Sequence, residues 1–471
     1  MLRLILLTLC LGQLGCETIE PTEQPPRPNI VLIMADDLGY GDLSCYGATH
    51  VNTPHIDALA RNGIRFTDYH SNGAVCSPTR AALMTGRYQQ RTGVEGVITA
   101  ARHREVGLPL EEVTIAEVLR DAGYATAMYG KWHLGYDIKR FGPQRQGFDT
   151  FEGFVSGNVD YFHKIDQEGH KDWYIGEKLR HVDGYVTDLI NDRAVDWIDH
   201  HQKEDSRTPF FLYLAHGAPH YPMQGPNDKG FREVGKKVRE TPDNPKPIYK
   251  AMIESMDEGI GRVMATLEKH GLTENTLVIF TSDNGHAPRY GGSAGPLRGQ
   301  KGTVYEGGHR VPIVMQWPAK VTAGGVSEMP VSGIDLFPTI TAMARTDLPA
   351  KVAIDGNDLR PFILDGFVPA PTRYLHWVHG NKHAIRFGIW KLVMNGNAKP
   401  ELYNLRDDLG EQKNLADEQP DRVERMREAH EDWLEKVRKG ANKISNKSGA
   451  DIPVCLLTKP EFIDSRFRPS A

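Results

Sequence analysis

A cysteine followed by a proline and an arginine is the first group in this sequence that could do chemistry. It is Cys76, within the segment AVCSPTRAALMTGR (residues 74–87). Pro78 suits the first turn of a helix and Ser77 before it is a good N-cap, so Cys76 is predicted at or just before a helix N-terminus. Free N–H groups there favour an anion, and Arg80 lies about one turn further along. The alternative is a buried structural cysteine, the usual role of a single Cys.

A second group consists of hard oxygen donors that follow two apolar runs. The run NIVLIMA ends in Asp36 and Asp37, and the run TLVIFTS ends in Asp283 and Asn284. Carboxylate and amide oxygens suit a divalent hard cation such as calcium or magnesium. Taken one pair at a time, capping and turn formation explain these residues equally well. Two such pairs together with the Cys76 segment favour a metal site.

Cationic and imidazole side chains follow other apolar runs. Lys131 and His133 come after ATAMYG, and His216 and His220 lie within AHGAPH, directly after FFLYL. Lys301 stands in the glycine-flanked segment GQKG. Each residue alone is usually a surface lysine or a satisfied core histidine. Their recurrence after predicted strands favours a shared site, with His216 in a supporting position.

These residues need a scaffold that brings the ends of several strands together. Buried strands are predicted from the apolar runs in PNIVLIMADD, YATAMYGKWH, TPFFLYLAHGAPH, TLVIFTSDNGH and VPIVMQWP. Helical spacing in EVTIAEVLRDAG and IYKAMIESMDEGIGRVMATLEKHG places helices between them. This alternation predicts an α/β fold with a large, mixed, mostly parallel sheet sandwiched by helices. Ligands of such sheets bind beyond the carboxyl ends of the strands, where the polar residues are found.

The pattern changes in the last quarter of the chain. Short β-like pieces, one of which contains His376 and Trp377, are separated by glycine and asparagine turns, and a long amphipathic helix follows. We therefore predict a larger domain over residues 28–368 and a smaller C-terminal α+β subdomain over residues 369–471, with a small antiparallel sheet and a helix.

The N-terminus and the composition bear on localisation and partners. One early arginine and a short apolar run predict a secretory signal over residues 1–16, followed by a proline-rich linker over residues 17–27 and an exported protein without a transmembrane span. Cys16 could be a lipoprotein cleavage site, although Leu is missing from its usual place. Pairing of Cys45 with Cys455 stays open. A net charge of −5 over 471 residues gives no basic excess for nucleic acid.

Taken together, the motifs closely resemble the type I sulfatases of the alkaline-phosphatase superfamily. They occur in the family's order, as NIVLIMADDLGYGDLSCYG, CSPTRAALMTGR, GKWHLG, APHYP, FTSDNG, GQKGTVYEGGHRVP and ELYNLRDDLGEQKNLA. The segment at Cys76 matches the Cys-x-Pro-x-Arg signature, with Thr79 where many members carry Ser. The resemblance implies an alkaline-phosphatase-like fold, with residues 28–368 as the sulfatase catalytic domain.

The resemblance also implies how the cysteine is used. In such enzymes a maturation enzyme oxidises the signature cysteine to formylglycine, an aldehyde that hydrates to a gem-diol. One hydroxyl attacks the sulfur of a sulfate ester, and elimination then expels sulfate. Cys76 would be the precursor of this nucleophile. Attack at sulfur requires the negative oxygens to be neutralised, so cations should surround the site.

Each matching position carries an implied role. The ligands of a calcium ion would be Asp36, Asp37, residue 76, Asp283 and Asn284. Arg80 and Lys131 would hold the diol and the metal-side oxygens, and His133 would be the base that triggers elimination. His220 and Lys301 would bind sulfate and help protonate the leaving oxygen, and Lys131 would also contact the substrate.

The predicted function is hydrolysis of sulfate monoesters, of sulfated carbohydrates or of small sulfate esters. One alternative is a phosphate or phosphonate ester hydrolase of the same superfamily. Another is a catalytically silent sugar-binding relative, against which the intact Cys76, Arg80 and metal positions argue. His286 and Arg289, which follow the DNG segment, are equally compatible with substrate contact and with solvation.

Overall fold

A ten-stranded sheet forms the centre of the computed structural model, which describes residues 26–238, 242–365 and 373–442. Its strands are, in spatial order, β11 (Gly325–Ser327), β2 (Ile64–Phe66), β10 (Ile313–Gln316), β9 (Thr276–Ser282), β1 (Asn29–Ala35), β8 (Phe210–Ala215), β4 (Ala125–Lys131), β5 (Thr150–Phe154), β6 (Tyr174–Ile175) and β7 (Lys178–Leu179). The neighbours β9, β1, β8, β4 and β5 are parallel, whereas β10 and β6 pair antiparallel with their neighbours. The prediction of a mixed, mostly parallel sheet is confirmed.

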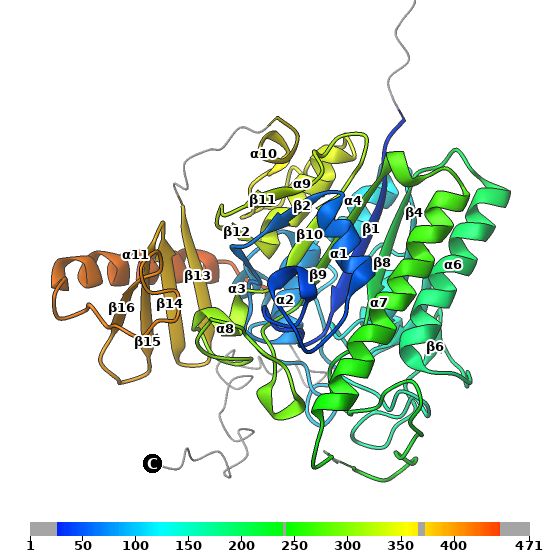
Figure 1. Cartoon of the computed structure of the whole chain (residues 1–471), viewed down its shortest axis with the longest axis horizontal. Helices are drawn as coiled ribbons and strands as arrows, with labels where there is room; N and C mark the ends of the chain where they lie inside the picture. The colour runs from blue at the N-terminus through cyan, green and yellow to red at the C-terminus, as the bar shows by residue number, and fades with distance from the viewer. Residues whose placement is uncertain (1–25, 239–241, 366–372, 443–471) are drawn as a thin grey trace, which may run out of the picture.

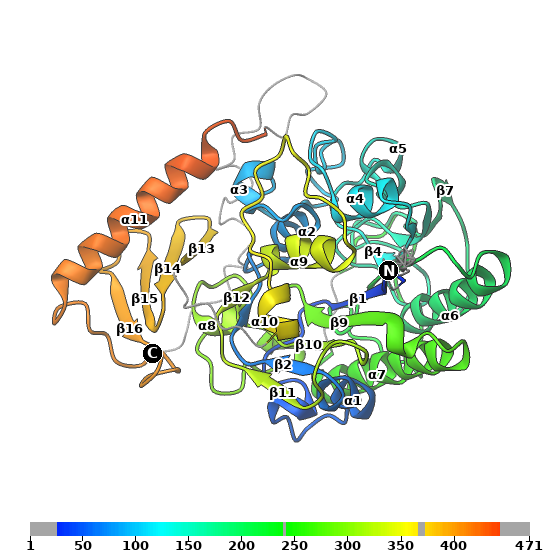
Figure 2. The ribbon, with the colours of Figure 1, turned by 90° about the horizontal axis from the view of Figure 1, so that it is seen from above.

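Helices cover both faces of this sheet (Figures 1 and 2). Alternate residues of β1 pack on opposite faces, Ile30 and Leu32 on one and Val31 and Ile33 on the other. The first face is covered by α2 (Cys76–Thr85), α4 (Ile115–Asp121), α9 (Leu336–Met343) and α10 (Arg360–Asp365). The second face is covered by α1 (Pro54–Arg61), α6 (Val186–Glu204) and α7 (Lys246–Lys269). The continuous apolar runs predicted from the sequence therefore reflect burial on two sides.

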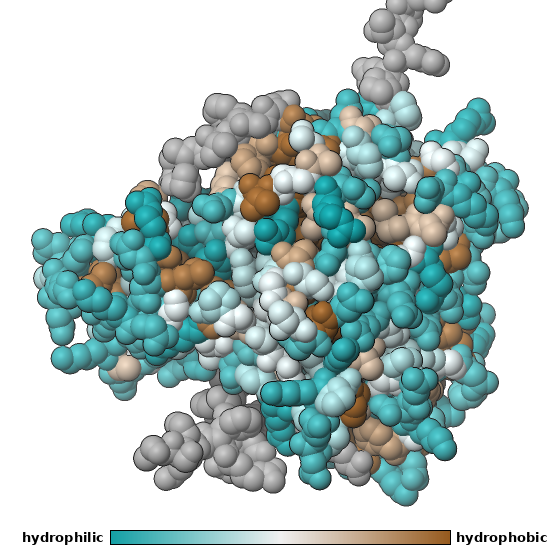
Figure 3. Space-filling view, viewed as in Figure 1, coloured by the Kyte–Doolittle hydropathy of each residue, from teal (hydrophilic) through white to brown (hydrophobic). Residues whose placement is uncertain are grey.

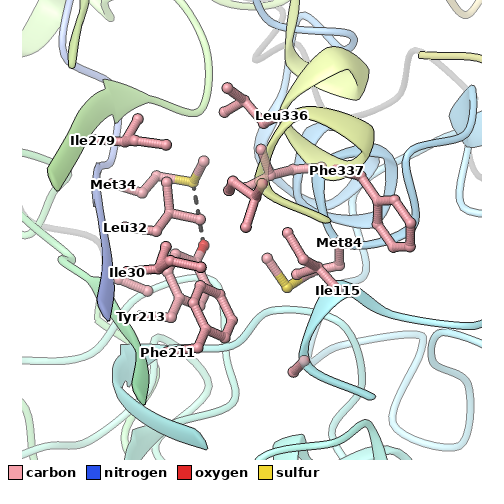
Figure 4. Packing of buried hydrophobic residues seen from close by; sticks show 14 of the residues in the cluster. Ile30, Leu32, Met34, Met84, Ile115, Phe211, Tyr213, Ile279, Leu336 and Phe337 are labelled. Carbon is pink, nitrogen blue, oxygen red and sulfur yellow. Dashed lines mark hydrogen bonds between the residues drawn. The ribbon is translucent and has the colours of Figure 1, made fainter. Parts of the chain in front are cut away.

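The first of these cores holds α2 against the sheet. Figure 4 shows Leu32, Met34 and Tyr213 of the strands on one side, with Met84 of α2 and Phe337 of α9 opposite them. The Tyr213 hydroxyl donates to Met34 Sδ at 3.3 Å. Because this core is tightly buried, the N-terminal end of α2 has a fixed position relative to the ends of the strands.

The remaining main-body elements are short and lie in the connections. The helical ones are η1 (Ser44–Tyr46), α3 (Gln89–Thr92), α5 (Ile138–Phe141), η2 (Pro143–Arg145), η3 (Thr273–Asn275), η4 (Pro288–Tyr290), α8 (Glu306–His309) and η5 (Gly333–Asp335). A two-stranded sheet pairs β3 (Tyr69–His70) with β12 (Val331–Ser332). Figure 3 shows a largely hydrophilic face with scattered apolar residues. Within the described residues, no helix has the length and apolar character needed to span a membrane.

A second, smaller sheet stands beside the main body. Its antiparallel strands are β13 (Tyr374–His379), β14 (Lys382–Phe387), β15 (Trp390–Asn395) and β16 (Glu401–Asn404), and α11 (Pro420–Arg438) packs on it. The predicted C-terminal antiparallel sheet and helix are confirmed as elements of the fold. The domain border at residues 368 and 369 lies outside the described residues and stays a prediction, as does the signal over residues 1–16. Cys16 and Cys455 also lie outside the described residues, so lipidation of Cys16 and pairing of Cys45 with Cys455 stay open.

Candidate active site

The ends of the parallel strands bring most of the predicted residues together. Asp36 and Asp37 directly follow β1, whereas His220 lies in the loop after β8. One ligand atom from each of these residues and from Cys76 lies within 4.8 Å of the others. This clustering is the expected outcome for polar residues that follow neighbouring parallel strands.

Helix α2 starts at Cys76 itself. Val75 is the N-cap, in extended conformation, so the prediction of Ser77 as N-cap is wrong by two residues. Ser77 Oγ instead accepts a hydrogen bond from the Ile98 N–H at 3.1 Å. Thr79 Oγ1 lies 3.2 Å from the Val75 carbonyl oxygen, which holds the approaching chain against the first turn. Cys76 therefore has the first helical position, where N–H groups lack helical partners.

The thiol of Cys76 is surrounded by charge but shielded from water. Its Sγ lies 3.6 Å from Asp36 Oδ1 and 3.4 Å from Lys301 Nζ, and the residue is 2% exposed. Burial raises the pKa of this thiol to about 12. At neutral pH the sulfur is therefore protonated and a poor nucleophile, unlike the thiolates of ordinary cysteine hydrolases.

Two buried cations neutralise two of the carboxylates. Lys131 Nζ lies 2.5 Å from Asp36 Oδ2. The Arg80 Nη2 and Nε atoms donate to Asp283 Oδ2 at 2.9 and 3.1 Å, and its Nη1 donates to the Lys131 carbonyl oxygen at 3.1 Å. The hydrogen bonds of Arg80 thus go to Asp283, the Lys131 main chain and, at 3.5 Å, the Tyr213 hydroxyl rather than to Cys76.

Asp37 is contacted from three directions. Lys301 Nζ lies 2.6 and 2.8 Å from its two carboxylate oxygens, Asn284 Nδ2 donates to Oδ1 at 2.7 Å, and His220 Nε2 lies 3.6 Å from Oδ2. Although burial opposes ionisation, Lys301 and His220 lower the pKa of Asp37 below its usual range. Asp37 is therefore ionised, and its φ of 62° places it in the left-handed region.

The oxygen cluster fits a divalent cation. The Asp36, Asp37, Asp283 and Asn284 side chains are buried, and Asn284 Oδ1 has no hydrogen-bond partner. Burial raises the pKa of Asp36 to about 7 although Lys131 opposes the rise, and the neighbouring carboxylates of Asp283 and Asp37 add to it. A hard cation would satisfy the amide oxygen and favour ionisation of the acids. The donor set is that of calcium or magnesium sites.

His133 and His220 each have one fixed ring nitrogen. The Ile98 carbonyl oxygen lies 2.9 Å from His133 Nε2 and the Tyr221 carbonyl oxygen lies 2.7 Å from His220 Nδ1, which assigns the ring protons to these atoms. His133 Nδ1 is buried without a partner. Burial, with Lys131 and other cations nearby, lowers the pKa of His133 well below its usual value. Its free nitrogen is therefore an unprotonated base.

Three other candidates are not members of the cluster of Asp36, Asp37, Cys76 and His220. His286 is buried with an unpartnered Nδ1, and its carbonyl oxygen accepts from Lys301 N at 2.9 Å. Arg289 is exposed, with its guanidinium 6.0 Å from the Tyr290 ring centre. His216 is fully buried with both ring nitrogens unpartnered, and burial lowers its pKa to about 3. A supporting position fits His216 better than direct contact with a substrate.

Sequence reasoning missed Gly157. A Cβ at this position would lie 2.9 Å from His133 Nε2, so only a glycine lets the loop pass this close to the ring. The neighbouring Ser156 Oγ donates to the Asn158 carbonyl oxygen at 2.9 Å, and Asn158 Oδ1 is buried without a partner. The segment SGN (residues 156–158), which follows the phenylalanine-containing segment TFEGFV, was the available signal.

Comparisons with known proteins agree with this arrangement. The family model described as Sulfatase matches residues 28–346, and that described as N-sulphoglucosamine sulphohydrolase, C-terminal, matches residues 299–440. Human arylsulfatase A is 35% identical over 446 residues, covering 82% of this chain and 83% of the relative. N-acetylgalactosamine-6-sulfatase of Rattus norvegicus is 36% identical, covering 78% of this chain and 71% of the relative.

A solved structure shares the whole architecture. The crystal structure of Ps i-CgsB in complex with k-i-k-neocarrahexaose has a TM-score of 0.80 and 30% identity, over 93% of this chain and 98% of that chain. The chain belongs to the sulfatase family, with the alkaline-phosphatase-like fold of that family. It is a sulfuric ester hydrolase of the arylsulfatase-like type.

Proposed function

We propose that this protein hydrolyses sulfate monoesters of sulfated carbohydrates, using formylglycine made from Cys76 and a bound calcium ion. The observation that carries the proposal is the convergence of a protonated, buried thiol with lysines and carboxylates at the strand ends. A carbohydrate is favoured because relatives include N-acetylgalactosamine-6-sulfatases and a solved neighbour was captured with neocarrahexaose.

Formylglycine at residue 76 would supply a hydroxyl nucleophile for the sulfur of the ester, in the form of a hydrated aldehyde. A maturation enzyme of the host would convert Cys76 to formylglycine, which fits a buried thiol whose raised pKa makes it a poor nucleophile. Asp36, Asp37, Asp283 and Asn284 would hold the calcium ion, which would supply positive charge to the site. The unpartnered Asn284 Oδ1 supports this assignment.

The chain's own cations and histidines perform the remaining tasks. Lys131 and Lys301 hold the sulfate oxygens as negative charge develops on them. His133 takes a proton at its free Nδ1 during release of sulfate. His220 directs Nε2 toward the site as a hydrogen-bond acceptor, the Lys301 ammonium passes a proton to the leaving oxygen, and Arg80 fixes Asp283 and the Lys131 main chain.

Matched aryl esters test this function. Protein matured in a host with a formylglycine-generating enzyme should hydrolyse 4-nitrophenyl sulfate with a higher kcat/KM than 4-nitrophenyl phosphate, and Cys76→Ala should abolish both activities. A reversed preference would assign a phosphate ester hydrolase. Sugar binding without turnover by matured protein would assign a silent relative.

We also infer export of the protein. The apolar leader and proline-rich linker over residues 1–27 support this, and an exported sulfatase meets sulfated polysaccharides outside the cell. Labelling with radioactive palmitate, compared with a Cys16→Ala variant, would distinguish a lipid-anchored protein from a released one.

A further inference from the structure

The tip of the β13–β14 hairpin presents two titratable side chains next to each other. Residues 380–381 make the turn, with Gly380 in the left-handed region at φ 63°, and His379 pairs with Lys382 across the strands. Side chains at directly paired positions lie on the same face of the ribbon. The imidazole and the ammonium group therefore form one small polar surface, which we call the hairpin tip.

The hairpin tip contacts the loop that carries Lys301. Lys382 Nζ donates to the Gly302 carbonyl oxygen at 2.9 Å, and a Cβ on Gly302 would lie 3.7 Å from His379 Nε2. Figures 1 and 2 show β13 as the strand of the small sheet nearest the main body, close to α8, which follows this loop. The small sheet thus reaches the candidate active site at this point.

The same loop is tied to the segment that leads to Cys76. The Gly302 N–H donates to the Ala74 carbonyl oxygen at 2.8 Å, and the Lys301 N–H donates to the His286 carbonyl oxygen at 2.9 Å. Gly302 has a φ of 77°, a conformation that suits glycine. The hairpin tip, the Lys301 loop and the Cys76 segment are therefore one continuous set of contacts.

Exposure shows from which side a substrate reaches this set. Cys76 and Asp37 are each 2% exposed and Asp36 is fully buried, whereas the Lys301 side chain is 22% exposed. Of the two side chains that contact Cys76 Sγ, Lys301 is the one that reaches solvent, so a sulfate group that approaches along Lys301 enters from this side. The group that carries the sulfate must therefore stay outside, on the side of Lys301 and the hairpin tip.

The hairpin tip has unused hydrogen-bonding capacity. The Lys382 ammonium has three donors, of which Gly302 takes one. Within the described residues the His379 ring forms no hydrogen bond. Burial lowers the pKa of His379 to about 4, so at neutral pH the ring offers one donor and one acceptor. The neutral His379 ring can bind a sugar hydroxyl, because it both donates and accepts. The Lys382 ammonium beside it can bind an anionic group next to that hydroxyl.

We propose that the hairpin tip binds the sugar that carries the scissile sulfate, with His379 on a hydroxyl and Lys382 on a second anionic group, a carboxylate or another sulfate. The substrate class is then a sulfated sugar or oligosaccharide with more than one negative charge. This inference rests on the proposed sulfatase function and assigns the specificity of that same site to the C-terminal sheet.

Substrate size separates this role from a purely structural one. The probes are 4-nitrophenyl sulfate, D-glucosamine-2-N,6-O-disulfate, N-acetylgalactosamine-6-sulfate and sulfated neocarrahexaose. Against the best sugar, Lys382→Met should lower kcat/KM roughly ten- to hundredfold more than against the aryl sulfate, mainly through KM. Lys382→Arg should restore most of the loss, and His379→Ala should show the same substrate dependence.

Three results would overturn the inference. Equal losses on sugar and aryl sulfate, with a weaker inhibition constant for inorganic sulfate, would show that Lys382 only positions Lys301. Equal activity of Lys382→Met and wild type on all sugars would exclude a contact, as would a preference for sugars with a single charge. Lys413→Met, on the exposed surface of the same region, is the matched control. Failure of the wild type on every sulfate ester would instead refute the proposed function.

Discussion

Lys301 contacts both the Asp37 carboxylate and the Cys76 thiol of the candidate site. Its ammonium lies 2.6 Å from Asp37 Oδ1 and 3.4 Å from Cys76 Sγ, within a largely buried environment. Electrostatic stabilisation at such a position is worth about 10²–10³ in rate. We expect Lys301→Ala to lower kcat for 4-nitrophenyl sulfate by about this factor, whereas the exposed Lys320→Ala should match the wild type. A loss below about tenfold would contradict the assigned role.

Most of the candidate residues could be predicted because their types repeat after apolar runs. Asp36 and Asp283 each follow a strand, and the structure brings both to the same end of the sheet. The partners within the cluster could not be predicted in the same way. That Arg80 bonds Asp283 depends on the position of α2 against the sheet, which no local pattern specifies.

At the scale of the elements, a buried charge network joins the small sheet to the main body. Lys391 Nζ of β15 lies 2.9 Å from Glu306 Oε1 of α8 and 2.9 Å from Glu411 Oε1, and all three side chains are fully buried. Arg386 of β14 makes a close ion pair with Asp68, which also accepts from His70. Because Lys391 and Arg386 already form ion pairs with these carboxylates, binding of a metal ion between His70 and Glu306 is unfavourable.

Removing one member of this network should be costly. Lys391→Met leaves Glu306 and Glu411 buried without their cation, and breaking a buried pair costs about 3–5 kcal/mol. We expect a decrease of that size in the free energy of unfolding by urea. The exposed Lys399→Met should change it by less than about 0.5 kcal/mol. Equal stabilities for the two variants would show that the network contributes nothing to docking.

Three histidines make the packing of α11 depend on pH. His430 Nδ1 lies 3.1 Å from His376 Nδ1, and His430 Nε2 lies 2.9 Å from His383 Nδ1. Burial lowers the pKa of His376 to about 2 and that of His430 to about 3. An unfolded histidine takes up a proton below about pH 6.5, so the unfolded segment then binds more protons. Stability should therefore fall from about pH 6.5 towards pH 3, by about 1.4 kcal/mol per pH unit for each ring.

Hydrogen exchange in α11 measures this effect locally. After correction for intrinsic exchange, the opening free energy should fall between about pH 7 and 5 in the wild type and fall less in His430→Gln. The exposed His181→Gln is the control, because its partner Asp183 is also in solvent. Identical pH slopes for wild type and His430→Gln would contradict the assignment.

The helices and strands themselves were largely predictable, whereas their precise starts were not. The apolar runs identified β1, β4, β8, β9 and β10 because each of them is buried. The N-cap of α2 was assigned wrongly because Ser77 Oγ accepts a hydrogen bond from the Ile98 N–H instead of from its own helix. Contacts across a long sequence separation decided the outcome.

At the scale of the whole molecule, calcium should stabilise the folded protein as well as support its activity. A ligand that binds only the folded state at about 100 times its dissociation constant adds about 2.7 kcal/mol. We expect calcium to raise the Tm of the chelator-treated wild type and not that of Asp36→Asn. Asp192→Asn, in an acidic groove between α6 and α7, should keep the response. Retention of the response by Asp36→Asn would instead indicate that calcium binds to other acidic groups.

The joining of the two sheets was beyond prediction from sequence. Lys382 meets Gly302 and Arg386 meets Asp68, over separations of 80 and 318 residues. Neither Gly302 nor Asp68 belongs to a periodic sequence pattern that would predict these contacts. Fold class and strand-end residues are therefore predictable from local pattern and resemblance, whereas the residues that shape specificity depend on how the small sheet docks.

The mass of the peptide that contains residue 76 tests the proposed chemistry most directly. It should be measured on protein from a host that matures a control sulfatase in parallel. The proposed function requires an aldehyde at this residue, and aryl sulfate activity should rise in proportion to the converted fraction. A full complement of unmodified thiol, in active protein and beside a converted control, would contradict the formylglycine mechanism.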